Sequence, residues 1–190
     1  MLFRSSFTIY DAADSLRLVT LVMKDMNLDP KRYNSRAIAG LISDAKNELM
    51  GPADFAQTVK NQFDEIVAEV FTHYQKRLSS ANALDFDDLI SRTVELLQRH
   101  PEIRAKYRSR FKHILVDEYQ DTNHAQYILI RELVGTSFDG FPMAELCVVG
   151  DSDQSIYAFR GANIRNILQF EDRKSTRLNS SHIPLSRMPS

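Results

Sequence analysis

The 190-residue sequence contains one cysteine, Cys147, so no internal disulfide bond can form. This composition fits a reducing compartment, and the apolar neighbours of Cys147 predict a small core side chain rather than a nucleophile. No apolar run is long enough to cross a bilayer, and the first ten residues lack the apolar segment of a secretory signal. We therefore expect a cytoplasmic protein that makes no contact with membranes.

The sequence also lacks an overall excess of positive charge. Its formal net charge is −1, and the last 19 residues hold four basic residues and one acidic residue. The remaining 20 basic and 24 acidic residues give residues 1–171 a net charge of −4. Any contact of this part with nucleic acid must therefore be local, because no general basic field attracts phosphate.

One dense basic run interrupts this acidic part, and it consists of Arg104, Lys106, Arg108, Arg110 and Lys112. The run could contact phosphate groups. We favour a solvated helix face instead, because Ile103, Tyr107 and Phe111 recur at helical spacing and would be buried on the other side of the helix.

Helical spacing dominates the first part of the chain. A short strand is predicted at 7–10. Apolar residues then recur every three or four positions. They predict helices at 13–26, from Asn34 or Ser35 to about 49, at 52–78, and from Asp85 to about 97. We predict that residues 13–110 are essentially all helical.

The pattern changes after residue 110. The apolar run at 114–116 is rich in β-branched residues and is typical of a parallel strand buried on both faces. Asn123 is the expected N-cap of a helix at 124–134, a second strand is expected at 146–149, and a last helix at 163–170. The fold class is therefore α/β, a parallel sheet with a large all-helical insert.

Carboxylates follow both of these predicted strands. HILV runs directly into Asp117 and Glu118, and LCVVG runs into Asp151. Ligands bind at the carboxyl ends of parallel strands, and in P-loop NTPases an acid at this position holds Mg²⁺. A second acid can take a proton from the attacking water. Helix capping or a solvated loop is the alternative, and the short motif alone would favour it.

A second stretch, VVGDSDQSIYAFRGA at 148–162, favours the functional interpretation. Gln154 is an amide just beyond a strand end, where it could contact a terminal phosphate. Tyr157, Phe159 and Arg160 combine aromatic rings with a cation, which is how proteins hold unpaired bases and phosphate without reading sequence. Taken alone, the two aromatic residues would more often belong to the core.

Together, DEYQDTN at 117–123 and GDSDQSIYAFRGA at 150–162 resemble motifs II and III of superfamily 1 DNA helicases of the UvrD/PcrA/Rep type. ALDFDDLI at 83–90 resembles the segment that returns to the first RecA-like domain from its helical insert. FTIYDAADS at 7–15 resembles the segment before that insert. The similarity covers about residues 7–171.

This resemblance implies a partial RecA-like P-loop NTPase sheet. Residues 1–12 and 111–171 would belong to the RecA-like domain, and 13–110 would form the 1B-like helical insert, with its return segment near 83–90. It also implies an ATP-dependent 3′–5′ DNA helicase of repair or replication. ATP and Mg²⁺ would be its cofactors, and single-stranded DNA and the single/double-strand junction its partners.

The resemblance assigns a role to each matching position. Asp117 is the Mg²⁺-associated acid, and Glu118 is the catalytic acid that activates water. Gln154 senses the γ-phosphate and links it to DNA. The remaining matches are two aromatic residues near the single strand and a basic residue at the nucleotide–DNA junction: Tyr157, Phe159 and Arg160. The family often has Trp where this chain has Phe159, so a smaller stacking area is expected.

Other acidic and amide residues near these motifs receive lesser roles. Gln120 and Asp121 lie within the motif and are expected to support it. We interpret Asp85, Asp87 and Asp88 as N-caps and partners of the helix dipole rather than as functional groups.

The phosphate-binding loop G-x-x-x-x-G-K-[ST] is missing, because none of the six glycines is followed by lysine. The second RecA-like domain, which supplies arginine fingers in this family, is also missing. We therefore expect a fragment that is inactive alone. Residues 172–190 are interpreted as a disordered, non-native tail, with a natural disordered basic tail as the alternative.

Two other functions remain open. One is the helicase subunit of a RecB/AddA-like helicase–nuclease, although the compact insert and the spelling SIYAFRGA argue against it. The other is a non-enzymatic module that binds DNA or protein, which the net charge of −4 over 1–171 makes less attractive.

Overall fold

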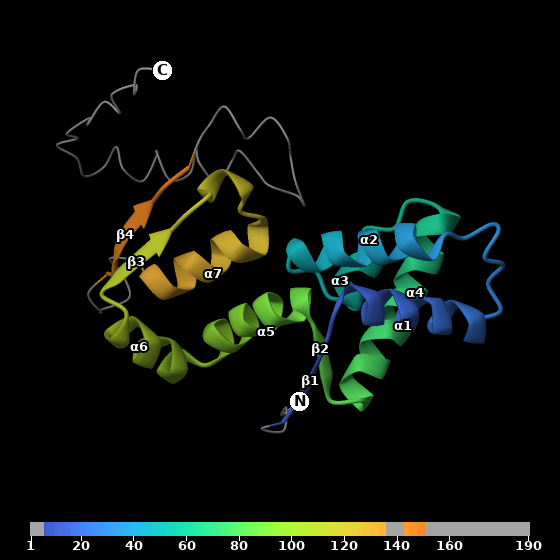
Figure 1. Cartoon of the computed structure of the whole chain (residues 1–190), viewed down its shortest axis with the longest axis horizontal. Coiled ribbons are helices and arrows are strands. Elements are labelled where there is room, and N and C mark those ends of the chain that lie inside the picture. Colours follow the sequence, from blue (N-terminus) through green and yellow to red (C-terminus); the bar gives the residue numbers. More distant parts are fainter. Residues whose placement is uncertain (1–5, 136–142, 151–190) are drawn as a thin grey trace, which may run out of the picture.

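The computed structural model describes residues 6–135 and 143–150, and it combines helices with short parallel strands (Figure 1). The first part contains β1 (Thr8–Tyr10), α1 (Ala12–Asp25), α2 (Ser35–Asn47), α3 (Pro52–Ala56) and α4 (Gln62–Ser80). The second contains β2 (Ala83–Asp85), α5 (Phe86–Arg99), α6 (Pro101–Arg110), β3 (His113–Val116), a 3₁₀ turn (Tyr119–Asp121), α7 (His124–Val134) and β4 (Glu145–Val148). The mixed α/β class predicted from the sequence is confirmed.

Side-chain caps determine where three helices begin. The Asn34 side chain accepts hydrogen bonds from backbone N–H groups at the start of α2, and Asp85 does the same for α5. Asn123 and Gln126 form a reciprocal capping box at the start of α7. Each cap satisfies N–H groups that the first helical turn leaves without a partner, so the predicted starts are confirmed.

The predicted helix at 52–78 is wrong, because residues 57–61 separate α3 from α4. Asn61 caps α4, and its Oδ1 accepts the Asp64 N–H at 3.0 Å. The Asp64 carboxylate in turn accepts the Lys60 N–H at 3.1 Å. These local hydrogen bonds compete with the helix and interrupt it, although the apolar spacing continues across the break.

Helix α2 ends earlier than predicted and β2 was not predicted. Leu49 has a positive φ of 59°, which is incompatible with a continuing helix. Strand β2 pairs in parallel with β1, with Thr8 opposite Ala83 and Tyr10 opposite Asp85. Residues 13–110 are therefore not all helical, because these three strand residues return the chain to β1.

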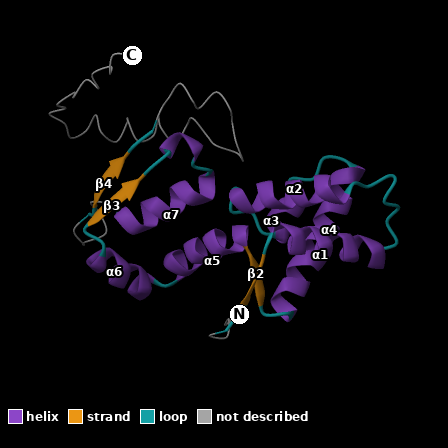
Figure 2. Cartoon of the chain, in the orientation of Figure 1, coloured by secondary structure: helices purple, strands orange, loops and turns teal. Residues whose placement is uncertain are grey.

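Strands β3 and β4 form a second parallel pair (Figure 2), with Leu115 opposite Cys147. The expectation that β3 is buried on both faces is wrong, because Leu115 is 77% exposed. Cys147 is also exposed, so its predicted place in the core is wrong. Successive strand residues point to opposite faces. Only the face that carries Ile114 and Val116 is partly covered.

The main core lies between α1, α2 and α4, and its most buried large side chains include Ile38, Phe71, Tyr74 and Leu78. A smaller cluster of Val94, Tyr127 and Ile128 joins α5 to α7. Figure 1 shows α1–α4 at one end of the molecule and β3, β4, α6 and α7 at the other, with α5 between them. In the described residues, no helix has the length and apolarity to cross a membrane.

The predicted burial of aromatic residues on α6 is wrong. Tyr107 is 39% exposed and Phe111 is 38% exposed, while Ile103 is half-buried. The reason is that Arg104 and Arg108 of the same helix turn toward Glu132 of α7. The side of α6 that contacts α7 is therefore partly ionic, and the aromatic rings lie outside that contact.

Candidate active site

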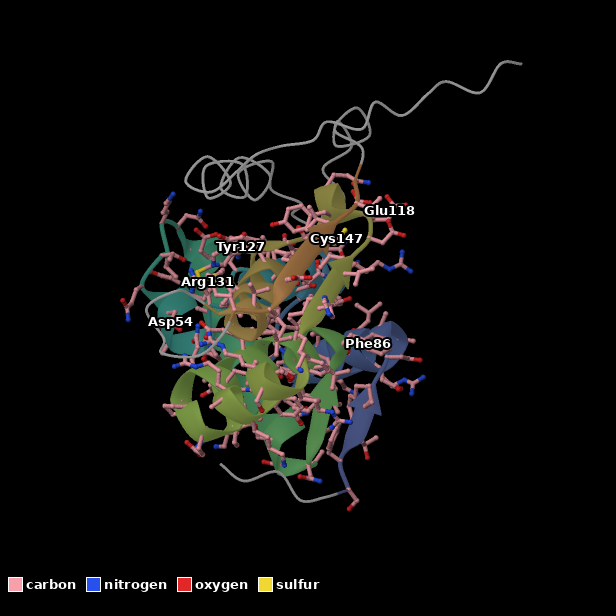
Figure 3. The ribbon with its side chains drawn as sticks, turned by 90° about the vertical axis from the view of Figure 1, so that its left-hand side faces the viewer. Asp54, Phe86, Glu118, Tyr127, Arg131 and Cys147 are labelled. Atoms are coloured by element: carbon pink, nitrogen blue, oxygen red, sulfur yellow. The ribbon has the colours of Figure 1, made fainter. Side chains whose placement is uncertain are left out.

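The segment 117–123, hereafter the acid loop, continues from the end of β3 and remains hydrogen-bonded to the end of β4. Val149 N–H donates to the Val116 carbonyl at 2.8 Å, and Tyr119 N–H donates to the Val149 carbonyl at 2.9 Å. Figure 3 shows Glu118 beyond the end of β3, close to the strand that carries Cys147. The two adjacent acids, Asp117 and Glu118, therefore lie at the carboxyl end of a parallel strand pair, as predicted.

Glu118 has an unusual backbone conformation. Its φ of 49° and ψ of 43° lie in the left-handed region, which costs a non-glycine residue about 1–2 kcal/mol. Its N–H donates to Asp117 Oδ1 at 2.9 Å, and its Oε2 accepts from Gln120 Nε2 at 2.6 Å. These contacts bring both carboxylates into one sharp turn and fix one oxygen of Glu118.

Gly150, just beyond the end of β4, lies close against this turn. A Cβ at position 150 would lie 2.5 Å from Gln120 Oε1 and 3.3 Å from the Gln120 backbone nitrogen. Such distances are too short for any other residue without movement of the Gln120 amide or the backbone. Gln120, at 3% exposed, is thus packed between the backbone of β4 and the Glu118 carboxylate. The support role expected for Gln120 has a physical basis here.

An open pocket of about 470 Å³ adjoins the acid loop. Asp117, Glu118 and Asp121 provide its carboxylates, and Leu129 and Ile130 of α7 provide part of its apolar wall. Hard carboxylate oxygens suit Mg²⁺, which binds through one or two carboxylates together with water and substrate phosphates. Within the described residues, no group of three or more His, Cys, Asp or Glu could hold a metal ion by itself. A magnesium ion here would therefore need phosphate or water oxygens as additional ligands.

A buried ion-pair cluster lies at the junction of α2, α4 and β2, and sequence reasoning missed it. Lys46 Nζ contacts Asp85 Oδ2 at 2.5 Å and Asp88 Oδ1 at 3.1 Å. Tyr74 OH donates to Asp85 Oδ2 at 2.8 Å. We call Lys46, Asp85, Asp88 and Tyr74 the Lys46 cluster. Burial, together with the Asp85 charge, raises the pKa of Tyr74 well above its ordinary value, so this hydroxyl remains a donor.

The aspartates at 85–88 therefore do more than cap α5. Asp85 Oδ1 does accept the Asp88 N–H at 2.7 Å, which confirms the predicted cap. Asp87 lines a separate pocket of about 570 Å³ that also reaches Asp121. Burial raises the pKa of the Asp87 carboxyl, and a hydrogen bond with Ser43 partly offsets that effect.

A buried hydrogen bond connects the acid loop to the helical part of the chain. Asn123 Nδ2, at the end of the acid loop, donates to Asn47 Oδ1 at 2.9 Å. Asn47 is the last residue of α2 and follows Lys46 directly. The two asparagines are 76 residues apart, so no local sequence pattern indicates this contact. Helix α2 thus contacts both the Lys46 cluster and the acid loop.

The remaining predicted site residues lie outside the described residues. They are Asp151, Gln154, Tyr157, Phe159 and Arg160. The predicted helix at 163–170 and the tail at 172–190 lie outside them as well. Of the predicted site, the structure brings together Asp117, Glu118 and their neighbours in the acid loop.

The fold and this site define a class, an α/β protein with adjacent carboxylates at the carboxyl end of a parallel strand. Comparison with protein families narrows the class. The family model described as UvrD/REP helicase N-terminal domain matches residues 2–175, and the chain belongs to this family.

Individual relatives agree with this assignment. The chain is 59% identical over 171 residues to "ATP-dependent DNA helicase UvrD1" of Mycobacterium tuberculosis (strain H37Rv), an alignment that covers 88% of this chain and 22% of the relative. It is 48% identical over 166 residues to "ATP-dependent DNA helicase PcrA" of Bacillus subtilis (strain 168), covering 87% of this chain and 22% of the relative. The chain thus spans about a fifth of the length of the curated relatives it matches.

Proposed function

We propose that this chain is part of an ATP-dependent 3′–5′ DNA helicase, and that the acid loop is its site of ATP hydrolysis. The observation that carries the proposal is the position of Asp117 and Glu118 in a sharp turn at the carboxyl end of β3, tied to the end of β4. Nucleotides bind at this edge of parallel sheets. Membership of the UvrD/REP family and the names of the relatives support the same activity.

The proposed domain organisation follows the family resemblance. Residues 1–12 and 111–171 belong to a RecA-like domain, and 13–110 form the helical insert. Strand β2 lies in the return segment near 83–90, and its pairing with β1 supports a return of the chain to its starting strand after α4. The Asn47–Asn123 hydrogen bond then holds the insert against the RecA-like part.

Asp117 and Glu118 divide the chemistry between them. Asp117 would hold Mg²⁺, which would supply positive charge for the phosphates of bound ATP. Glu118 accepts the proton of the attacking water. The Gln120 amide orients Glu118 by holding its Oε2, which leaves Oε1 for the water.

The residues of 148–162 complete the proposed mechanism. Gln154 contacts the γ-phosphate and reports its presence to the DNA site. Tyr157 and Phe159 stack on unpaired bases, and Arg160 contacts phosphate where nucleotide and DNA meet. Hydrolysis thereby drives movement along single-stranded DNA and separation of the duplex.

The 190 residues contain no G-K-[ST] sequence to hold the phosphates of ATP. Hydrolysis and unwinding are therefore proposed for a longer protein that includes such a loop. The 190-residue chain alone is expected to show no DNA-stimulated release of phosphate.

A chimeric helicase tests the proposal. Residues 7–171 of this chain would replace the aligned segment of the Bacillus subtilis PcrA, and ATP hydrolysis would be measured with and without single-stranded DNA. We expect DNA-stimulated hydrolysis by the chimera. The Glu118→Gln variant should lose about 100-fold or more in kcat while it still binds nucleotide, because only the proton acceptor is removed.

The matched control is Glu69→Gln, the same change at an exposed position of α4. It should leave kcat unchanged. Near-normal turnover by Glu118→Gln would show that Glu118 is not the proton acceptor. A properly folded chimera without any hydrolysis would contradict the proposed function itself.

A further inference from the structure

Helix α6 is held in one rotational orientation by ionic contacts with α7. Arg104 Nη1 lies 3.1 Å from Glu132 Oε2, and Arg108 Nε donates to the Glu132 carbonyl at 2.7 Å. Glu132 is buried, so these contacts are protected from solvent. The opposite side of α6 is consequently fixed toward solvent.

The solvent side of α6 carries two parallel stripes of side chains. Lys106 and Arg110 are four residues apart and both are exposed. Tyr107 and Phe111 are also four residues apart, and their rings stack with centroids 6.0 Å apart and planes inclined by 20°. Tyr107 and Arg110 are three residues apart, a spacing at which side chains are neighbours on a helix surface, so this cation lies beside one of the rings. Together with the exposed Lys112, these five residues form what we call the α6 face.

The charge of the α6 face is uncompensated within the part of the chain that the structure describes. Lys106, Arg110 and Lys112 form no ion pair with any described residue. Two nearby acids have other partners, since Glu102 contacts His100, and Glu145, which lies opposite His113 in the paired strands, contacts His113. Three cations and two partly exposed, stacked rings therefore remain available in a chain whose residues 1–171 have a net charge of −4.

We propose that the α6 face binds single-stranded nucleic acid. Aromatic faces stack on unpaired bases, and adjacent cations neutralise the phosphates that link them. A protein partner that covered only the apolar rings would leave three positive charges beside a dry contact, which is costly unless the partner is acidic. A single strand can use both features at once, because its bases stack on the rings and its phosphates contact the cations.

This contact is separate from the proposed site of hydrolysis. Helix α6 leads into the first residue of β3, and the acid loop follows the last residue of β3 (Figure 1). Four strand residues span about 13 Å, so the α6 face cannot be part of the acid loop pocket. The choice of DNA as the ligand rests on the proposed helicase function, but the contact needs neither ATP nor Asp117 and Glu118.

The test is binding of a fluorescent oligo(dT) to the 190-residue chain without nucleotide, measured by anisotropy over a series of salt concentrations. Each phosphate contact with a single strand contributes about −0.7 to the slope of log K against log salt. The triple variant Lys106→Gln, Arg110→Gln and Lys112→Gln should therefore flatten the slope by about 2. The matched control Lys24→Gln, Lys31→Gln and Lys60→Gln removes the same charge from exposed positions elsewhere and should not change the slope.

The rings are tested separately. Tyr107→Leu and Phe111→Leu keep apolar bulk but remove the stacking surface, and each should weaken oligo(dT) binding about fivefold or more. Binding of a duplex of the same length should not change. The charge variants alter only exposed side chains, so they provide the test even if a ring variant fails to fold.

Four results would overturn the inference. They are no oligo(dT) binding at low salt, an equal effect of the control triple, equal affinity for duplex with the same slope, and self-association through this face in sedimentation experiments. None of them affects the Glu118→Gln experiment in the chimera. Failure of this inference and failure of the helicase proposal are therefore distinguishable.

Discussion

Replacement of Lys46 by methionine should destabilise the protein strongly. The Lys46 side chain is 4% exposed, and its partners Asp85 and Asp88 are 8% and 2% exposed. Lys46→Met leaves the buried Asp85 carboxylate without its cation and leaves Asp88 only Arg92, whose Nε lies 3.8 Å away, and removal of one partner from a buried pair costs about 3–5 kcal/mol. Since Lys46 forms ion pairs with two carboxylates, we expect the free energy of unfolding to fall by an amount near the upper end of that range.

The assay is urea unfolding of the 190-residue chain, followed by far-ultraviolet circular dichroism. Lys76→Met, the same change at an exposed position of α4, is the control and should alter the free energy of unfolding by less than about 0.5 kcal/mol. A triple variant that adds Asp85→Asn and Asp88→Asn to Lys46→Met should recover much of the loss, because it leaves no buried charge unpaired.

Two results would refute this reasoning. A loss below about 1 kcal/mol for Lys46→Met would mean that the carboxylates reach water in the folded protein. A triple variant no more stable than Lys46→Met would mean that lost packing of the lysine stem, which also lies against the Tyr74 ring, dominates the effect.

Two further substitutions test other parts of the structure. The raised pKa of Asp87 means that the folded state binds this proton more tightly than the unfolded state, so its charge opposes folding at neutral pH. Asp87→Asn, which can still accept from Ser43, should raise the melting temperature at pH 7, and the gain should vanish as the pH falls below about 4; a gain that persists in acid would contradict this. Asn123→Ala removes the cap of Gln126 N–H and the partner of Asn47, and should lower the free energy of unfolding by about 2–4 kcal/mol in urea titrations. Asn123→Asp keeps the cap alone and should lose less; equal losses would show that the cap contributes nothing.

Local interactions explain which features the sequence predicted correctly. Asn34, Asp85 and Asn123 cap helices by bonding to N–H groups two or three residues away, so their effect is visible in a short window of sequence. The β-branched apolar run that forms β3 is similarly local. The acids directly after it had to lie at the end of β3, and the structure has them there.

Features that depend on distant contacts could not be predicted. Lys46 looks like an ordinary charge in the last turn of a helix, and only the return of the chain 39 residues later buries it against Asp85. Leu115 and Cys147 have the composition of buried strand residues, yet their exposure depends on whether anything covers that face of the sheet. Exposure of Tyr107 likewise depends on Glu132, a residue of another helix.

The end of α2 also limits how this sequence can change. Lys46 and Asn47 are consecutive. Lys46 forms ion pairs with Asp85 and Asp88, and Asn47 accepts a hydrogen bond from Asn123. A substitution at any of these five positions removes a partner from a buried polar group, which is unfavourable wherever it occurs. Viable replacements should therefore arise as matched sets, with position 46 varying together with 85 and 88, and position 47 varying together with 123. A collection of related sequences should show these two groups as correlated substitutions, even though their members come from distant parts of the chain.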